Sequence, residues 1–367
     1  MSLYNELETA RKEIKTDTYP ITIRELVSLY RDGEIDIHPE FQRFMRWTEA
    51  QKTKLIESIL LGIPLPSVFL FQRKDGVLDV VDGLQRISTI LRFMGELKGE
   101  DGDVLSPLVM GKADYLPSLE GKLWGKEGDS SSVGAEIQRF FRQEKLQIQM
   151  LLRDSDEQTK FELFQRINTG GTPLSDQEVR NCILIMINRD AYFWLEGISQ
   201  DLNFQECCAV PDRMKRERYD TELALRFLTF EGLDVSRVSE ISDLNTFITK
   251  EMRENFNENY DFDTKKISFS ETFKLLNECS DENVLRKYDC QKGRFMGPFL
   301  ISAFEMIALG VSANLEHVKS KEPEWLLEKI KSLWNDQRTF GIYGTGVSTA
   351  RRLPKTIDFG REFFSEE

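Results

Sequence analysis

Histidine and cysteine are scarce in this chain, which limits the metal and redox chemistry it can carry. Its 367 residues include two histidines and five cysteines. With only His38 and His317, we expect neither a multi-histidine metal site nor a histidine-centred nuclease. The cysteines are irregularly spaced and form no C-x-x-C pair, so the sequence predicts reduced thiols rather than a disulfide framework or structural zinc. They are Cys182, Cys207, Cys208, Cys279 and Cys290.

Long apolar runs are also missing. No segment approaches the roughly 18 to 20 consecutive apolar residues that a membrane-spanning helix needs, and the first residues, MSLYNELE, do not resemble a signal peptide. With 40% hydrophobic and 30% charged residues, the composition is typical of a soluble globular protein that is large enough for two domains. We therefore expect a cytoplasmic protein without a membrane partner.

Positive charge is in the minority. The formal net charge is −13 and the sequence pI is about 5.0. This balance argues against a protein that coats nucleic acid non-specifically, because such binding depends on neutralising phosphates. A local basic groove is still compatible with the composition.

The first part of the chain predicts an α/β domain. Capping-box patterns open helices at Thr22 and Thr48, and a strand is expected over 34–37. Two apolar runs, 67–71 and 77–81, are joined by Lys-Asp-Gly and predict a hairpin. A helix with apolar residues on one face follows the hairpin directly.

The remaining sequence suggests an insertion and then a helical domain. Residues from about 99 to 142 are rich in glycine, serine and acidic residues and predict an irregular insertion. Alternation over 146–150 predicts a strand that returns to the sheet. We predict an N-terminal domain over 1–153 and a largely α-helical domain over 154–367. Segments with helical periodicity lie at 155–167, 175–187, 221–230, 243–256, 270–278, 295–309 and 323–335. The tail combines glycines over 341–346 with Arg351 and Arg352.

The joint between the hairpin and the next helix carries the most informative residues. They are Asp82, Gly83, Leu84, Gln85 and Arg86, called the DGLQR motif below. A glycine lets the backbone approach a ligand closely, a helix N-terminus supplies N–H groups, and arginine and aspartate supply charges of both signs. These are the components of a phosphate or nucleotide site. Asp-Gly before a helix is also a common turn and cap, so the motif alone leaves both interpretations open.

Two other segments supply polar side chains of the kind that bind nucleotides. Gln42, Arg43 and Arg46 lie in a loop after the first strand, and Arg166 and Asn168 precede a Gly-Gly turn. Each has a structural alternative, because a loop arginine can pair with a surface aspartate and an Asn-Gly-Gly sequence can end a helix. In the functional interpretation the three segments line one cleft between two domains.

Six short motifs are spread over the first half of the chain. They are Pro39-Glu40-Phe41-Gln42-Arg43, Trp47, Ile56-Glu57-Ser58-Ile59-Leu60, Pro64-Leu65-Pro66, Asp82-Gly83-Leu84-Gln85-Arg86 and Phe164-Gln165-Arg166-Ile167-Asn168-Thr169-Gly170-Gly171. Together, and in this order, they resemble the N-terminal domain of GmrSD-type proteins, also called domain-of-unknown-function family 262. The resemblance covers about residues 15–185.

The resemblance implies a ParB/sulfiredoxin-like N-terminal fold, and so an α+β chain in which this α/β domain precedes the α-helical one. It also implies that the family's D-G-Q-Q-R motif binds and hydrolyses a nucleotide in prokaryotic restriction and phage-defence systems. Leu84 stands where that motif has its first glutamine, so we expect binding and leave hydrolysis open. Complete restriction enzymes of the family add a His-Asn-His nuclease domain. With only His317 in the C-terminal half, we expect a stand-alone member without it.

The sequence therefore predicts a nucleotide-binding regulatory protein that acts with DNA or with a separate nuclease or defence subunit. Asp82, Gln85 and Arg86 are expected to act in NTP hydrolysis if it occurs, with Asp82 as a ligand of Mg²⁺. The residues expected to bind the NTP, whose base the sequence does not specify, are Gln42, Arg43, Arg46, Gly83, Leu84, Arg166 and Asn168. The alternative is a non-catalytic DNA- or protein-binding adaptor that uses the same arginines. The oligomeric state is open, and a homodimer is one option.

Overall fold

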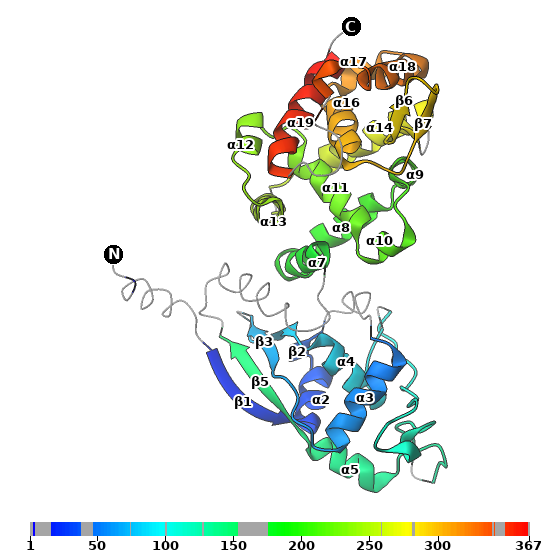
Figure 1. Ribbon diagram of the computed structural model, residues 1–367. Helices are drawn as coiled ribbons and strands as arrows, with labels where there is room; N and C mark the ends of the chain where they lie inside the picture. Colours follow the sequence, from blue (N-terminus) through cyan, green and yellow to red (C-terminus); the bar gives the residue numbers. More distant parts are fainter. Residues whose placement is uncertain are drawn as a thin grey trace. The chain divides into compact units, whose positions relative to one another are not determined.

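The computed structural model divides the chain into two compact units, residues 1–173 and 174–367 (Figure 1). The structure describes Leu3 and residues 16–37, 47–73, 75–99, 101–126, 128–152, 175–257, 259–280, 283–339, 341 and 349–365. The predicted domain limit between residues 153 and 154 falls outside the described residues and remains a prediction. Each unit is described by itself below.

Unit 1 is built on a five-stranded mixed sheet. Its strands are β1 (Thr16–Thr22), β2 (Ile35–Asp36), β3 (Val68–Gln72), β4 (Leu78–Asp82) and β5 (Lys145–Leu151). They are ordered β1-β5-β3-β4-β2, with parallel pairing of β3 to β5 and of β2 to β4, and antiparallel pairing elsewhere. Strands β2 and β4 therefore terminate at one end of the sheet, and β3 and β5 terminate at the other.

Four helices share one hydrophobic core with this sheet (Figure 1). They are α2 (Ile23–Arg31), α3 (Glu49–Leu60), α4 (Leu84–Phe93) and α5 (Ala135–Gln143). Alternate strand residues such as Val68, Leu70 and Val80 are buried in one hydrophobic core with Ile56 of α3 and Ile90 of α4. The predicted fold class, an α/β domain followed by a helical one, is confirmed. Its ParB/sulfiredoxin-like character remains a prediction.

Side-chain caps determine where two of these helices begin. The Thr48 hydroxyl accepts a hydrogen bond from the Gln51 N–H at 3.3 Å, and the Gln51 side chain accepts one from the Thr48 N–H at 2.9 Å. This is a complete capping box, as the sequence predicts. Thr22 caps α2 by accepting from the Glu25 N–H at 3.1 Å.

The sequence does not predict two elements of this unit. Strand β1 has only one fully buried residue, Ile21, so it lacks the alternation that marks a half-buried strand. The predicted irregular insertion over 99–142 is wrong in its last part, because helix α5 begins at Ala135. In α5 only Phe141 is fully buried, and its ring packs edge-to-face against Phe93 and Trp124.

The irregular part of the insertion is fixed to helix α3. The buried Glu57 carboxylate accepts from the N–H groups of Tyr115 and Leu116 at 2.6 and 2.8 Å, and Thr53 Oγ1 accepts from the Gly111 N–H at 2.9 Å. These bonds satisfy backbone groups of a segment that lies outside the five-stranded sheet. A single 3-10 turn, η2 (Pro117–Leu119), interrupts it.

Unit 2 is largely α-helical, as predicted. Its described helices are α7 (Asp176–Ile187), α8 (Arg189–Ser199), α9 (Leu202–Cys208), α10 (Asp212–Arg216), α11 (Tyr219–Phe230), α12 (Val235–Ser239), α13 (Leu244–Asn255), α14 (Phe262–Ser280), α15 (Ile301–Ala303), η5 (Phe304–Ala308), α16 (Leu309–Ala313), α17 (Leu315–Lys319), α18 (Pro323–Leu333), η6 (Gln337–Thr339) and α19 (Thr349–Ser365). Phe204, Phe227, Phe269 and Phe273 form the aromatic centre of the core, with ring centroids 4.7 to 5.5 Å apart. None of the five cysteines forms a disulfide.

The predicted helix over 295–309 begins too early. Strands β6 (Lys287–Asp289) and β7 (Arg294–Met296) form a hairpin instead, and helical structure starts at Ile301. Gly297, with φ of 81°, and Pro298 separate the two elements, because neither residue type favours a continuous helix. The helix then passes through η5, which is a π-helical turn.

Helical structure also replaces part of the predicted tail. Residues 342–348 lie outside the described residues, whereas Arg351 and Arg352 belong to α19. Arg352 is not a surface cation but is buried against η5. Its guanidinium donates to the Glu305 carboxylate at 2.9 and 2.8 Å, and the Thr356 hydroxyl donates to the same carboxylate at 2.9 Å.

The backbone of helix α19 touches the backbones of the π-helical turn and of α16. A Cβ added at Gly360 would lie 2.1 Å from the Met306 carbonyl oxygen, and one added at Gly310 would lie 2.5 Å from the Gly360 carbonyl oxygen. These backbones cannot move away easily, because the Arg352–Glu305 pair holds α19 and the π-helical turn together. Glycine is therefore required at both positions.

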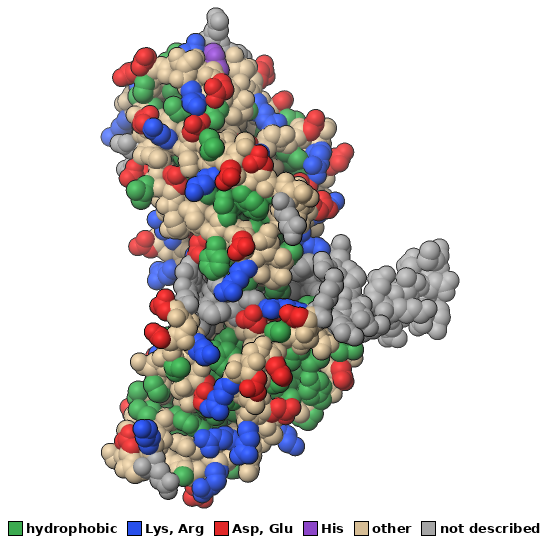
Figure 2. Space-filling view, turned by 180° about the vertical axis from the view of Figure 1, so that it is seen from behind, with side chains coloured by type: hydrophobic (Ala, Val, Ile, Leu, Met, Phe, Trp, Pro, Cys, Tyr) green, Lys and Arg blue, Asp and Glu red, His purple; other side chains and the backbone are tan. Residues whose placement is uncertain are grey.

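The described surface shows hydrophobic side chains interspersed with charged side chains of both signs (Figure 2). No helix within the described ranges is long and apolar enough to cross a membrane.

We expect Gly360→Ala to lower the free energy of unfolding by about 3 kcal/mol or more, because its methyl group overpacks a rigid backbone contact. The control is Gly197→Ala in α8, where a Cβ meets nothing within 4 Å. That substitution should raise the free energy of unfolding by about 0.5–1 kcal/mol through helix propensity. Urea unfolding followed by circular dichroism measures both. Equal effects of the two substitutions would contradict the packing account.

Candidate functional site

The DGLQR motif lies at the junction of β4 and α4. Asp82 is the last residue of β4, and Gly83 is the N-cap of α4 with φ of 97° and ψ of 8°. A Cβ at Gly83 would meet Val68 Cγ2 at 2.9 Å, so both the backbone conformation and the space require glycine. Among the described residues, no side chain caps the N-terminus of α4. The backbone N–H groups of the first turn of α4 therefore do not bond to a capping side chain of the described residues.

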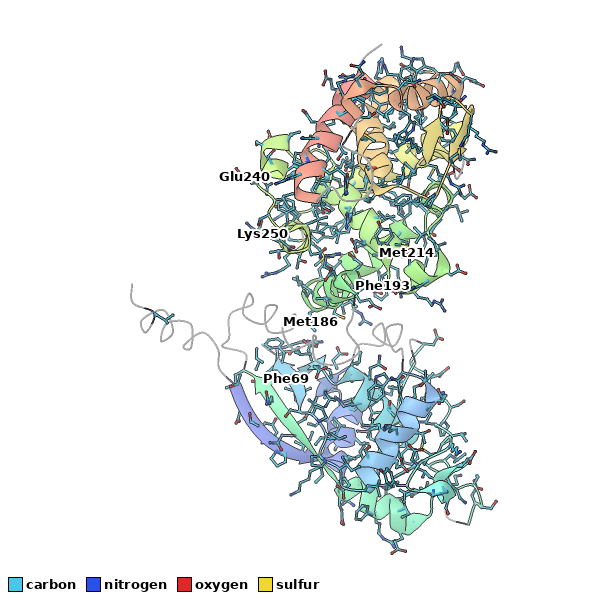
Figure 3. The ribbon with its side chains drawn as sticks, in the orientation of Figure 1. Phe69, Met186, Phe193, Met214, Glu240 and Lys250 are labelled. Atoms are coloured by element: carbon cyan, nitrogen blue, oxygen red, sulfur yellow. The ribbon has the colours of Figure 1, made fainter. Side chains whose placement is uncertain are left out.

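The strand geometry changes next to this junction. Phe69 of β3 pairs with Asp82, whereas the next residue, Leu70, pairs with Val80. The register thus shifts by one residue at Val81, as in a β-bulge. Bulges are common beside active sites because they redirect the side chains that follow. Figure 3 shows Phe69 at this part of the sheet.

Arg86 points into the protein from the first turn of α4. It is only 8% exposed. Its guanidinium donates to the Pro66 carbonyl, to the Ser67 carbonyl at 3.1 Å and to Asp82 Oδ2 at 2.8 Å. Burial lowers the pKa of Arg86, and the neighbouring Asp82 carboxylate opposes that shift. The guanidinium therefore joins the segment before β3 to the end of β4.

The other motif residues are partly accessible. The Asp82 side chain is 36% exposed, and Leu84 and Gln85 are half-buried. The Gln85 carbonyl accepts a hydrogen bond from the Thr89 hydroxyl at 2.6 Å. Within the described part of the chain, no three His, Cys, Asp or Glu side chains are grouped to hold a metal ion. A Mg²⁺ ion at Asp82 remains a prediction, and most of its ligands would come from phosphates and water.

The junction can bind an anion through its backbone. A glycine turn followed by a helix N-terminus directs N–H dipoles at one point, where they favour phosphate or carboxylate oxygens. Arg86 adds a fixed positive charge behind the turn, because arginine stays protonated even when buried. Asp82 places a carboxylate beside the same point.

Half of the predicted site residues lie outside the described residues. They are Gln42, Arg43, Arg46, Arg166 and Asn168. Their contribution to the site therefore remains a prediction.

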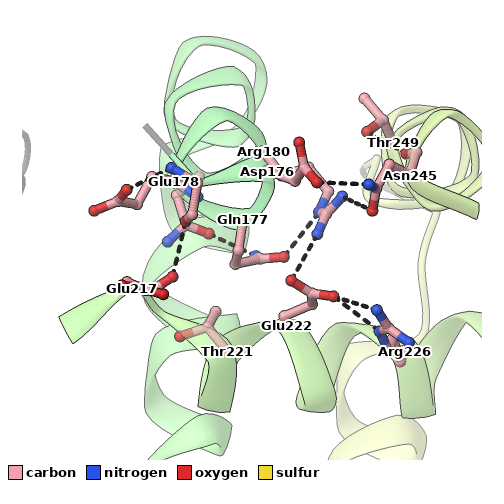
Figure 4. Close-up of polar contacts among 12 residues, drawn as sticks. Asp176, Gln177, Glu178, Arg180, Glu217, Thr221, Glu222, Arg226, Asn245 and Thr249 are labelled. Atoms are coloured by element: carbon pink, nitrogen blue, oxygen red, sulfur yellow. Dashed lines mark hydrogen bonds and ion pairs between the residues drawn. The ribbon is translucent and has the colours of Figure 1, made fainter. Parts of the chain in front are cut away.

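Helix α7 at the start of unit 2 buries a second polar group of side chains (Figure 4). Arg180, 1% exposed, donates to the Gln177 side chain at 2.8 Å and lies 3.3 Å from the Glu222 carboxylate of α11. Its Nη1 also lies 3.4 Å from Asn245 Oδ1 in α13. Burial lowers the pKa of Arg180, and Glu222 opposes that shift. Glu222 pairs in addition with Arg226.

Sequence reasoning assigns this part of α7 only a capping box, which the structure confirms. Ser175 accepts from the Glu178 N–H at 3.2 Å, and the Glu178 side chain accepts from the Ser175 N–H at 2.7 Å. Polar residues at positions 177, 180 and 181 follow helical spacing, a pattern that is typical of a solvent-exposed face. No signal in the sequence shows that α11 and α13 cover this face.

Part of the chain matches a known protein family. The sequence model described as GmrSD restriction endonuclease, N-terminal domain, matches residues 23–185. The chain carries a GmrSD-type N-terminal domain. No curated protein and no solved structure matches the chain.

The GmrSD-type domain extends beyond unit 1. It includes the DGLQR motif, α7 as far as Ile185 and the other four strands of the sheet, but not β1. The buried Arg180 therefore belongs to the matched domain, whereas its partners Glu222 and Asn245 follow it in the sequence. The family places the protein in a restriction or phage-defence context, in which a nuclease or another defence protein is the expected partner.

We expect Arg86→Met to lower the free energy of unfolding by about 2–3 kcal/mol, because it removes the hydrogen bonds that the charged guanidinium donates to the Pro66 and Ser67 carbonyls and to Asp82. The matched control is Arg92→Met in the same helix. Arg92 is one-third exposed. It forms a long ion pair with Glu49, at 3.6 Å, and a long hydrogen bond to the Ser106 carbonyl, at 3.5 Å; the ion pair contributes at most about 1 kcal/mol. Thermal and urea unfolding compare the two variants. A smaller loss for Arg86→Met than for Arg92→Met would show that the buried bonds are unimportant.

Proposed function

We propose that the GmrSD-type domain binds a nucleotide at the DGLQR motif and that the chain is a regulatory component of a restriction or phage-defence system. The observation that supports this proposal most directly is the glycine turn at Gly83. Its positive φ, the absence of room for a Cβ, and the helix N-terminus without a side-chain cap are the features that phosphate-binding turns share.

In this proposal each residue of the motif has a separate task. The N–H groups of residues 83–85 face the phosphates, and Asp82 orients Mg²⁺ or a water molecule. Arg86 holds the turn in shape and contributes its charge from behind it. Gln42, Arg43 and Arg46 neutralise the remaining phosphate charge, and Arg166 and Asn168 contact the ligand from the second segment. This division assigns Arg86 less direct contact with the phosphates than the sequence alone suggests.

Binding is tested by thermal unfolding of the full chain with a panel of nucleotides and Mg²⁺. A nucleotide at 100 times its Kd stabilises by about 2.7 kcal/mol, which raises the Tm by several degrees. Asp82→Asn should reduce the Mg²⁺-dependent part of this shift. Asp75→Asn, in the exposed hairpin turn between β3 and β4, should leave it unchanged. The absence of a shift with every nucleotide would refute binding at this site.

Hydrolysis is a separate part of the proposal and depends on position 84. We expect Leu84→Gln, which restores the family's D-G-Q-Q-R motif, to raise the rate of phosphate release at saturating nucleotide at least tenfold. Leu84→Met preserves the size and apolar character of the side chain and should leave the rate unchanged. Phosphate release is measured alongside binding. Unchanged release by Leu84→Gln, with binding intact, would limit the function to binding.

A further inference from the structure

Phe69 of β3 (Figure 3) is an aromatic side chain that lies outside the hydrophobic core of unit 1. Its neighbours Val68 and Leu70 are each 1% exposed and belong to that core. Because successive side chains of a strand point to opposite faces of a sheet, the Phe69 ring lies on the other face. It is half-buried and forms no ring contact with any of the described residues. The core therefore does not account for an aromatic residue at this position.

Gln149 of β5 lies beside Phe69 on the same face. The two residues are register partners in the parallel β3–β5 pair. Gln149 stands between Ile148 and Met150, which are both buried in the core, so its side chain points away from the core as well. The Gln149 side chain is half-buried and forms no hydrogen bond within the described part of the chain. Its amide can both donate and accept a hydrogen bond.

On its other side, Phe69 is the register partner of Asp82, the first residue of the DGLQR motif. Gln149, Phe69 and Asp82 thus follow one another across the neighbouring strands β5, β3 and β4. Two strand spacings, or roughly 10 Å, separate the first from the last. Gly83 comes directly after Asp82, and a Cβ there would meet the side chain of Val68, the residue before Phe69. The glycine turn is therefore adjacent to the part of β3 that carries the ring.

We propose that the base of the bound nucleotide stacks on Phe69 and that the Gln149 amide hydrogen-bonds to the edge of the base. The inference rests on nucleotide binding at the DGLQR motif and adds a second part to the same site. The glycine turn alone would hold any phosphate or polyphosphate, because its N–H groups contact only phosphate oxygens. Phe69 supplies a flat apolar surface one strand away, and Gln149 supplies a donor and an acceptor two strands away.

This arrangement defines the class of ligand. Phe69 and Gln149 give nucleoside triphosphates an advantage over inorganic polyphosphates, since only the former carry a base. An aromatic ring stacks on every base, because every base has a π-face. A glutamine amide can turn its donor or its acceptor toward the base. We therefore expect the site to require a base and to discriminate little among the four common ones.

The test is isothermal titration calorimetry of the full chain with Mg²⁺ and, in turn, ATP, GTP, CTP, UTP and inorganic triphosphate. The ratio of the Kd for inorganic triphosphate to the Kd for each nucleotide measures the contribution of the nucleoside. We expect Phe69→Leu to reduce this ratio about tenfold, as the loss of one base–aromatic stack predicts. The Kd for inorganic triphosphate should not change. Phe69→Tyr preserves the ring and should preserve the ratio, and Gln149→Ala should reduce it about fivefold through the loss of a hydrogen bond.

The matched control is Phe140→Leu, the same substitution at a phenylalanine of α5 whose side chain is 47% exposed. It should change neither Kd. A ratio that stays the same in Phe69→Leu would overturn the stacking of the base, and phosphate binding at the DGLQR motif would still stand. If none of the five ligands binds the unmodified chain, the proposed function of the motif is refuted, and the stacking proposal fails with it.

Discussion

The buried guanidinium of Arg86 is the interaction on which the candidate site depends. It connects three short stretches of backbone: the segment before β3, the end of β4 and the first turn of α4. One side chain supplies the donor for two backbone carbonyls and for a carboxylate. The same side chain carries its positive charge behind the glycine turn, where it pairs with the Asp82 carboxylate. The shape of the turn and the charge that we propose acts on phosphates therefore come from one residue.

Gly83 complements this arrangement. Its left-handed conformation and the proximity of Val68 leave no room for another residue. Gly83 and Arg86 thus determine the turn together. Gly83 permits its backbone conformation because it has no side chain, and Arg86 buries a charged side chain against the segments around it. These two residues fix the backbone of the turn. The accessible Asp82 carboxylate and the register shift at Val81 lie directly before it, at the end of β4.

Much of the fold can be predicted because its signals are local. The capping boxes at Thr48 and Ser175 contain their hydrogen-bond donors and acceptors within four residues. The β3–β4 hairpin and the helix that follows it are encoded in the same way. Elements that depend on distant partners are not predictable from such signals. Strand β1 exists because it pairs with β5, and α5 is held by one phenylalanine in an aromatic cluster from three segments.

The candidate site is predictable to a similar extent. The sequence identifies the DGLQR motif and its turn, because strand, glycine and helix follow one another directly. The sequence does not reveal that Arg86 faces inward, since the Pro66 and Ser67 carbonyls that attract it lie about twenty residues away. Arg180 presents the same difficulty. A polar helix face looks exposed until two later helices are known to cover it.

The buried Arg180 of helix α7 limits which sequences can follow the matched domain. The matched domain ends within this helix, yet its arginine is neutralised by a glutamate that comes later in the chain. An unrelated C-terminal half that covered the same face of α7 without a carboxylate would bury a charge with no counterpart, which is strongly destabilising. A C-terminal half that covers this face therefore needs a compatible carboxylate. Helix α7 thus restricts which C-terminal sequences can follow the matched domain.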